Sequence, residues 1–131
     1  MNTVLKYLLI MVGGAFGSLL RYLLQGVFTA RAQTAFPLGT LIVNVSGCFA
    51  IGLLSALFNG PFPIRVEYRV GILVGVLGGF TTFSSFGWET FSLANEGQFV
   101  RAGANVLFSV ALGLVAVWAG YRLAERWHGV S

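Results

Sequence analysis

Charged residues are scarce in this sequence. Only 9% of its 131 residues are Asp, Glu, Lys or Arg, whereas about a quarter of an ordinary soluble domain is charged. Hydrophobic residues make up 56% of the chain, and the mean hydropathy is +0.83. A hydrocarbon core about 30 Å thick needs roughly 20 apolar residues per helix, so this length can cross a bilayer about four times. We therefore expect an all-α, multi-pass membrane protein without a separate soluble domain.

Cysteine and histidine occur once each in this sequence, and aspartate does not occur. The one cysteine, Cys48, excludes an intramolecular disulfide and a multi-cysteine metal site. The one histidine, His128, lies near the C-terminal end, and no nucleophile, histidine and acid combine into a catalytic set. The chain carries four acidic and eight basic residues, for a formal net charge of +4. The sequence thus argues against an enzyme and favours anions over cations as ligands.

Four apolar runs are separated by short polar segments. We predict membrane spans over residues 4–28, 38–58, 70–94 and 102–123 within a single domain of residues 1–131. The first run lacks a small-residue cleavage site, so we expect a retained helix rather than a signal peptide. Short loops between four spans place both termini on one side of the membrane. The basic residues favour one side only modestly, which leaves the orientation undetermined and suits insertion in both directions.

Glycine recurs at a spacing that lets membrane helices pack closely. Gly13 and Gly17 are four residues apart in the first span, and so are Gly71 and Gly75 in the third. Small residues allow two helix backbones to approach where no hydrophobic force acts between helices. We interpret most of the glycines as packing residues. Because four helices are too few to enclose an obvious pore, a homodimer is the simplest way to build one.

The third span contains a polar interruption, LGGFTTFSSF at residues 77–86. Non-helical backbone at membrane depth must be buried in protein or line a hydrated cavity, because an unmet amide or carbonyl costs several kcal/mol in lipid. Hydroxyls can also bond back to the preceding turn and merely bend a helix. Two glycines followed by paired threonines and serines favour a break. Broken membrane helices present freed carbonyls to cations and freed amides to anions.

Two phenylalanines lie within this interruption, three residues apart. Phe83 and Phe86 could simply face lipid, as apolar aromatic residues of membrane helices usually do. The edge of a phenyl ring carries positive electrostatic potential, however, so a ring turned edge-on can favour a small anion. A pore lined in this way would pass an anion without a fixed positive charge.

Two other spans carry polar pairs at helical spacing. Thr40 and Asn44 share one helix face, and so do Asn105 and Ser109. An asparagine in the bilayer core is costly unless its amide is bonded. Each asparagine is therefore either an interhelical link or a pore donor, and the spacing alone does not decide between the two.

The motifs of this chain resemble those of the Fluc fluoride channels, also called CrcB proteins, over essentially the full length. The resemblance is carried by GGAFGSLLRY at 13–22, PLGTLIVNVSG at 37–47, GGFTTFSSFGWET at 78–90 and NVLFS at 105–109. It implies a small four-helix protein with a broken third helix that assembles as an antiparallel, dual-topology homodimer. Such a dimer would hold two fluoride pores and one central structural sodium ion, and would export fluoride passively across the bacterial inner membrane.

The resemblance also implies roles for individual residues. Asn44 would offer its amide to fluoride, while Phe83 and Phe86 would contact the ion with their ring edges. The backbone carbonyls of Gly78 and Thr81 would hold the sodium ion. The remaining implied residues are those of the polar track, Thr40, Thr82, Ser84, Asn105 and Ser109, the vestibule residue Arg21 and the motif residue Glu89.

Two other functions fit a small four-helix membrane protein. A multidrug or cation antiporter needs a carboxylate within the membrane, and Glu89 comes closest, beyond the interruption. A structural subunit of a larger complex would use the glycine faces but leaves the polar interruption unexplained. The GGAFGS cluster lacks the strand, helix and downstream acid of a dinucleotide fingerprint. We expect neither a nucleic-acid partner nor an organic cofactor.

Overall fold

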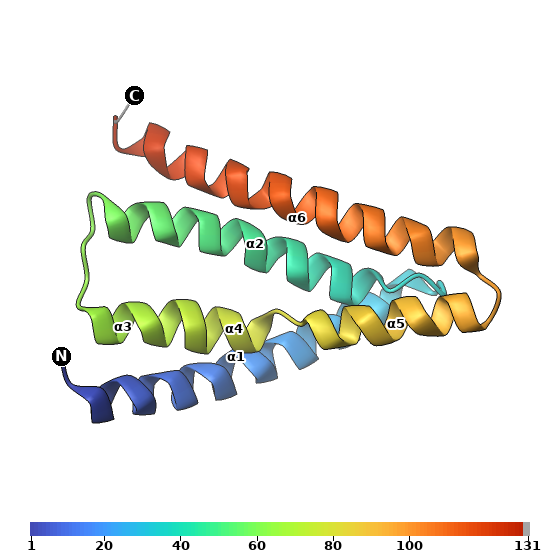
Figure 1. Cartoon of the computed structure of the whole chain (residues 1–131), viewed down its shortest axis with the longest axis horizontal. Coiled ribbons are helices and arrows are strands. Elements are labelled where there is room, and N and C mark those ends of the chain that lie inside the picture. Colours follow the sequence, from blue (N-terminus) through green and yellow to red (C-terminus); the bar gives the residue numbers. More distant parts are fainter. Residues whose placement is uncertain (130–131) are drawn as a thin grey trace.

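The computed structural model describes residues 1–129 as a bundle of long helices (Figure 1). Four stretches are long and apolar enough to cross a membrane: α1, α2, the segment Val66–Asn95 and α6. This confirms the prediction of an all-α, multi-pass membrane protein, and the described residues contain no strand. The elements in chain order are α1 (Thr3–Ala32), α2 (Leu38–Asn59), α3 (Val66–Val70), η1 (Gly71–Val76), α4 (Leu77–Phe80), α5 (Phe83–Asn95) and α6 (Phe99–Trp127).

The helices extend a few residues beyond the predicted spans, because local capping rather than hydropathy fixes their ends. The Asn2 side chain accepts a hydrogen bond from the Leu5 N–H at 3.0 Å and so starts α1 at Thr3. The same helix ends where Gln33 turns left-handed, with φ 46°. Gly97, with φ 78°, makes the turn between α5 and α6.

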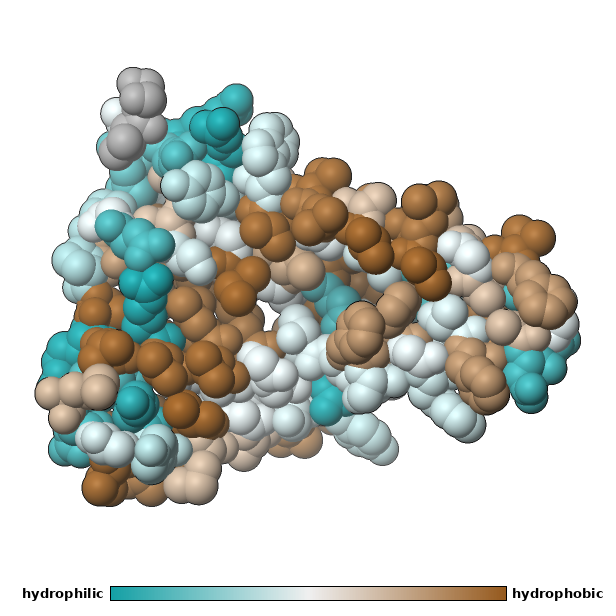
Figure 2. Space-filling model, viewed as in Figure 1, coloured by the Kyte–Doolittle hydropathy of each residue, from teal (hydrophilic) through white to brown (hydrophobic). Residues whose placement is uncertain are grey.

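The helices pack in two pairs. The first half of the third span lies along α1, and α2 lies along α6 (Figure 1). The start of α1 and the end of α6 share one end of the bundle with the α2–α3 loop, as the short loops predicted. The most hydrophilic residues gather at the two ends, whereas at mid-length apolar residues follow α6 along the upper edge and residues of intermediate hydropathy lie below them (Figure 2). This distribution matches a bundle that spans a bilayer.

Glycines bring the backbones of each pair into direct contact. A Cβ atom added to Gly17 would overlap the Val76 carbonyl oxygen. In the other pair, a Cβ atom at Gly52 would overlap the Val117 carbonyl, and one at Gly120 would overlap the Phe49 carbonyl. We call these contacts the α1–η1 seam and the α2–α6 seam. They confirm the packing role that the glycine spacing predicted.

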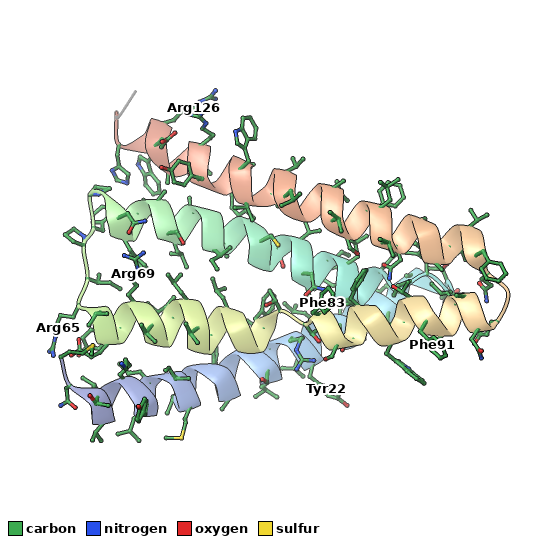
Figure 3. All side chains as sticks on the ribbon, in the orientation of Figure 1. Tyr22, Arg65, Arg69, Phe83, Phe91 and Arg126 are labelled. Atoms are coloured by element: carbon green, nitrogen blue, oxygen red, sulfur yellow. The ribbon has the colours of Figure 1, made fainter. Side chains whose placement is uncertain are left out.

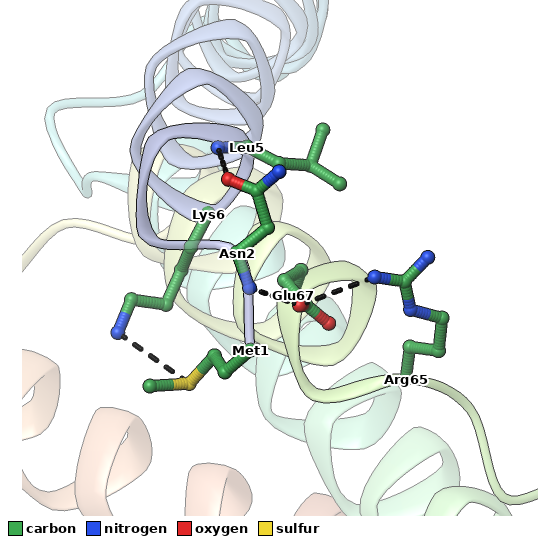
Figure 4. A network of polar contacts seen from close by, with 6 residues as sticks. All are labelled: Met1, Asn2, Leu5, Lys6, Arg65 and Glu67. Atoms are coloured by element: carbon green, nitrogen blue, oxygen red, sulfur yellow. Dashed lines mark hydrogen bonds and ion pairs between the residues drawn. The ribbon is translucent and has the colours of Figure 1, made fainter.

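A polar tether joins the start of α1 to the start of α3 (Figure 4). The Glu67 side chain is buried, and its Oε1 accepts hydrogen bonds from the Asn2 backbone N–H at 2.6 Å and from Arg65 Nη2 at 3.3 Å. The exposed Arg65 thus neutralises a carboxylate that is only 3% exposed. The tether fixes the two helices against each other at the end of the bundle where the α1–η1 seam begins.

The third span changes its winding twice. In η1, which was not predicted, the chain forms a π-helix, and the Leu77 N–H donates to the Ile72 carbonyl five residues back. The predicted break follows at Thr81 (φ −87°, ψ 155°) and Thr82 (φ −148°, ψ 116°), where the backbone is extended. The break is narrower than the polar interruption, because Gly78 and the following glycine still belong to α4. After the break, α5 starts with Thr82 as its cap.

Candidate functional site: a cavity at the helix break

The Asn44 side chain replaces one backbone bond that the break removes. In a continuous helix the Thr82 N–H would donate to the Gly78 carbonyl. Here it donates to Asn44 Oδ1 at 2.8 Å, and Asn44 Nδ2 donates to the Thr82 carbonyl at 2.9 Å. Asn44 therefore links α2 to both backbone groups of one residue in the break. Because the amide has two N–H donors, this pairing leaves one for another partner.

The break is held from its other side by α1. Arg21 Nε donates to the Gly79 carbonyl at 3.1 Å, an oxygen that a continuous helix would pair with the Phe83 N–H. Within the third span, the Thr81 hydroxyl donates to the Leu77 carbonyl at 2.9 Å. Side chains from two neighbouring helices thus bond to two of the backbone groups that the break exposes, the Thr82 N–H and the Gly79 carbonyl.

A cavity of about 370 Å³ opens at the break. We call it the central cavity, and the visible face of the molecule is hollowed at mid-length (Figure 2). It brings together the predicted pore residues Asn44, Thr82, Phe83, Phe86 and Ser109, and the predicted sodium-site residues Gly78 and Thr81. Much of the remaining lining is apolar and comes from α2 and the first half of the third span. The cavity therefore combines a few polar groups with an apolar wall.

The two phenylalanines form a tilted pair at this cavity. The ring centroids of Phe83 and Phe86 lie 5.4 Å apart with an interplanar angle of 44°. Phe83 is 83% exposed at the start of α5 (Figure 3), whereas Phe86 is half-buried. Both rings line the cavity, and the edge of a phenyl ring carries positive potential.

Main-chain oxygens suited to a hard cation also lie at the break. The Gly78 carbonyl loses its helical donor because the Thr82 N–H goes to Asn44. The Thr81 carbonyl loses the Ser85 N–H, which bonds to the Thr82 hydroxyl at 3.2 Å instead. Hard cations prefer oxygen ligands, and channels hold alkali ions with backbone carbonyls. The two residues therefore fit the sodium site that the resemblance implies.

Thr40 and Glu89 lie away from the central cavity in a second polar cluster. Gln25 Nε2 donates to Thr40 Oγ1 at 2.8 Å, and Thr40 Oγ1 donates to Glu89 Oε1 at 2.6 Å. Glu89 Oε2 is buried and has no hydrogen-bond partner within residues 1–129. Two further cavities, of about 280 and 690 Å³, both reach Thr40 and Glu89. Gln25, which lies one helical turn after Arg21, was not predicted as a site residue.

Asn105, which the spacing left open as a link or a pore donor, forms a buried interhelical link. It is 1% exposed, and its Nδ2 donates to Thr90 Oγ1 at 2.9 Å. Thr90 in turn donates to the Phe86 carbonyl at 2.7 Å. Thr90 was not predicted as a site residue, although it lies four residues after Phe86 in the same motif, on the same helix face. The link connects α6 to the helix that carries the phenylalanines.

Of two further hydroxyls of the predicted polar track, Ser109 lines the central cavity and Ser84 does not. Ser109 lines the central cavity, 3.5 Å from Asn105 Oδ1. Ser84 is exposed, and its hydroxyl lies 3.3 Å from that of Thr82. The predicted residues thus fall into a group at the central cavity and a group around it.

Comparison of the chain with known proteins shows the family to which it belongs. The family model described as CrcB-like protein, Camphor Resistance (CrcB), matches residues 8–121. The fluoride-specific ion channel FluC of Solibacter usitatus is 53% identical over 122 residues, which cover 93% of this chain and 100% of the relative. The protein of the same name from Geobacter sulfurreducens is 50% identical over 126 residues, covering 96% and 99%. The chain therefore belongs to the CrcB-like family.

Proposed function

We propose that this protein is a fluoride-selective ion channel. It exports fluoride passively and electrodiffusively across the bacterial inner membrane and thereby confers resistance to fluoride; it is not an enzyme. The observation that carries the proposal is the central cavity, where the Asn44 amide, two phenylalanine rings and the Ser109 hydroxyl lie together at the helix break. The names of relatives at 53% and 50% identity support the same activity.

The lining of the cavity suits a small, strongly hydrated anion. The free N–H of Asn44 and the Ser109 hydroxyl replace water molecules of the ion, and the ring edges of Phe83 and Phe86 add weak positive potential. Within the described chain, the residues that line the cavity include no lysine or arginine. Fluoride is therefore solvated without a fixed charge that would trap it, which conduction requires.

The proposed assembly is an antiparallel, dual-topology homodimer. Phe83 supports it, because this large apolar side chain stands 83% exposed beside a cavity that one copy leaves open. A second copy packed on this face would close the cavity. Light scattering of the purified protein in detergent should give the mass of two chains. A stable monomer that still transports fluoride would overturn this part of the proposal.

The proposed dimer has one cofactor, a sodium ion. The backbone carbonyls of Gly78 and Thr81 would hold it, with four oxygens from two copies. Bound there, the ion supplies structural cross-linking between the copies. Replacing sodium with a larger cation such as N-methylglucamine should lower the thermal stability of the dimer. Thr81→Ala would leave this dependence unchanged, because the ligand is a carbonyl.

Efflux from liposomes tests the proposed activity. The purified protein is reconstituted into liposomes loaded with fluoride or chloride, valinomycin collapses the membrane potential, and ion-selective electrodes record efflux. Rapid fluoride efflux without chloride efflux is the expected result. A folded dimer that releases neither ion would overturn the proposal and would favour the alternative function as a structural subunit of a larger complex.

One observation favours the antiporter as a second candidate. Glu89 lies in a membrane span with one buried carboxylate oxygen unpartnered within residues 1–129, and proton-coupled carriers use such a carboxylate. The same liposomes, loaded with a pH indicator, decide between the two. We expect no release of protons when a lipophilic cation is added outside, whereas an antiporter would exchange the two.

A further inference from the structure

Arg21 contacts the helix break through one defined atom. Its Nε donates to the Gly79 carbonyl at 3.1 Å, and the side chain forms no ion pair within the described residues. The same turn of α4 lies directly against α1. A Cβ atom added to Gly79 would lie 2.6 Å from the Gly14 carbonyl oxygen and 3.1 Å from Ser18 Oγ. Gly14, Ser18 and Arg21 thus form one face of α1 that receives this turn.

The carbonyls that the break frees have two different surroundings. The Gly79 carbonyl is bonded by α1, whereas Gly78 and Thr81 line the central cavity. Consecutive peptide groups of one helical turn have linked orientations, since only φ and ψ can rotate. A bond that fixes the Gly79 carbonyl towards α1 therefore also sets how the neighbouring peptide groups face the cavity.

We infer that Arg21 is a positioning residue for the break, and that it acts through the Nε hydrogen bond rather than through its charge. The bond holds the turn at Gly79 from the α1 side while Asn44 holds Thr82 from the α2 side. Together they fix where α5 restarts, and so where Phe83 lies. This inference rests on the proposed fluoride conduction, and it differs from the vestibule role, which needs only the positive charge.

Two substitutions separate the hydrogen bond from the charge. In Arg21→Gln, the amide nitrogen lies the same number of bonds from Cα as the arginine Nε, so a donor remains and the charge is lost. In Arg21→Lys, a methylene occupies that position, so the charge remains and the donor is displaced. Arg31 lies exposed in the last turn of the same helix, and its Gln and Lys variants are matched controls.

Fluoride and chloride efflux from liposomes are measured for each folded dimer. We expect Arg21→Gln to keep fluoride efflux within about threefold of the original protein and to keep its selectivity. We expect Arg21→Lys to lower fluoride efflux about tenfold or more and to allow chloride efflux, which the original protein lacks. Both Arg31 variants should match the original protein. A loss of folded protein alone would lower fluoride efflux without allowing chloride efflux.

Hydrogen exchange at the amides of residues 78–86 gives a readout independent of fluoride. Exchange there should be faster in Arg21→Lys and unchanged in Arg21→Gln. The reverse pattern in efflux and exchange would assign the role to the charge and overturn the inference. It would also be overturned if both variants behaved like the original protein, or if both lost selectivity and protection. If the original protein released no fluoride, the proposed function would fail, while the exchange pattern would still decide the inference.

Discussion

The seams and the central cavity are built by opposite means. At the α1–η1 and α2–α6 seams, glycines such as Gly17 and Gly120 remove side chains so that backbones touch. At the cavity, Asn44 and Arg21 extend from neighbouring helices and bond to backbone groups that have lost their helical partners. Packing thus supplies stability where lipid offers no hydrophobic force, and polar side chains supply the site.

The second region depends on the first. Arg21 lies on α1 and Asn44 on α2, so the two hydrogen bonds that hold the break require both helices to keep their places in the bundle, where the seams pack them. Changes at the cavity should therefore alter transport more than assembly. Changes at the seams should alter assembly first, and transport only as a consequence.

The largest effect on transport is expected from Asn44→Asp. The carboxylate can still accept from the Thr82 N–H, but it cannot donate to the Thr82 carbonyl, and it places a negative charge in the central cavity. Fluoride efflux should fall below detection. Asn59→Asp, at the exposed end of the same helix, should leave efflux unchanged. Retained efflux in folded Asn44→Asp would remove Asn44 from the conduction path.

The largest effect on stability is expected from Gly17→Ala. The new methyl group overlaps the Val76 carbonyl oxygen, and a backbone cannot move aside as a side chain can. We expect a loss of about 3 kcal/mol of stability, measured by thermal unfolding in detergent. Gly103→Ala is the control, because open space surrounds Gly103 and alanine favours a helix by about 1 kcal/mol. Equal stability of the two variants would contradict close packing at the seam.

A smaller effect on transport is expected from Phe83→Ile. Isoleucine keeps most of the bulk and removes the ring edge, a loss of about 1 kcal/mol of ion stabilisation or roughly a fivefold lower fluoride efflux. Phe91→Ile serves as the control, because this exposed ring lies on the same helix against Trp88 and does not line the cavity. If Phe83→Ile conducts like the original protein, the ring serves packing alone.

The smallest effect is expected at the tether that aligns the α1–η1 seam. Glu67→Gln keeps an oxygen for the Asn2 N–H and loses the ion pair with Arg65. Stability should fall only slightly, because the neutral amide oxygen still accepts from the Asn2 N–H, and efflux should be unchanged. Arg122→Ala breaks the exposed Arg122–Glu125 pair and should cost less than about 0.5 kcal/mol. A larger loss for Arg122→Ala than for Glu67→Gln, in thermal unfolding, would contradict this order.

Hydropathy and residue type predicted much of the fold. The four helices follow from their apolar length, and the break at Thr81 follows from the polar interruption in an apolar span. The π-helix at η1 could not be predicted, because the residues Gly71–Val76 do not differ in type from an ordinary apolar helix. In the packed bundle Gly75 of this segment lies against the backbone of α1, and residue type alone does not show such a contact.

The sequence selected residues of the candidate site but not their hydrogen-bond partners. The sequence selected Asn44, Phe83 and Arg21, and the structure places the first two at one cavity. It could not show that the Asn44 amide bonds to the Thr82 backbone, or that Arg21 bonds to the Gly79 carbonyl, because both bonds join residues far apart in the chain. Nearly every residue type offers the same backbone N–H and carbonyl groups, so the sequence does not show which of them a side chain will bond.

The reversal potential of the current in a planar bilayer tests passive fluoride conduction most directly. With a tenfold fluoride gradient, equal chloride on both sides and an opposing pH gradient, current through the reconstituted protein is recorded against voltage. The potential should reverse at the fluoride equilibrium value, about 59 mV, and should not move when the pH gradient is removed. A reversal at zero, or one that follows the pH gradient, would contradict a passive fluoride channel.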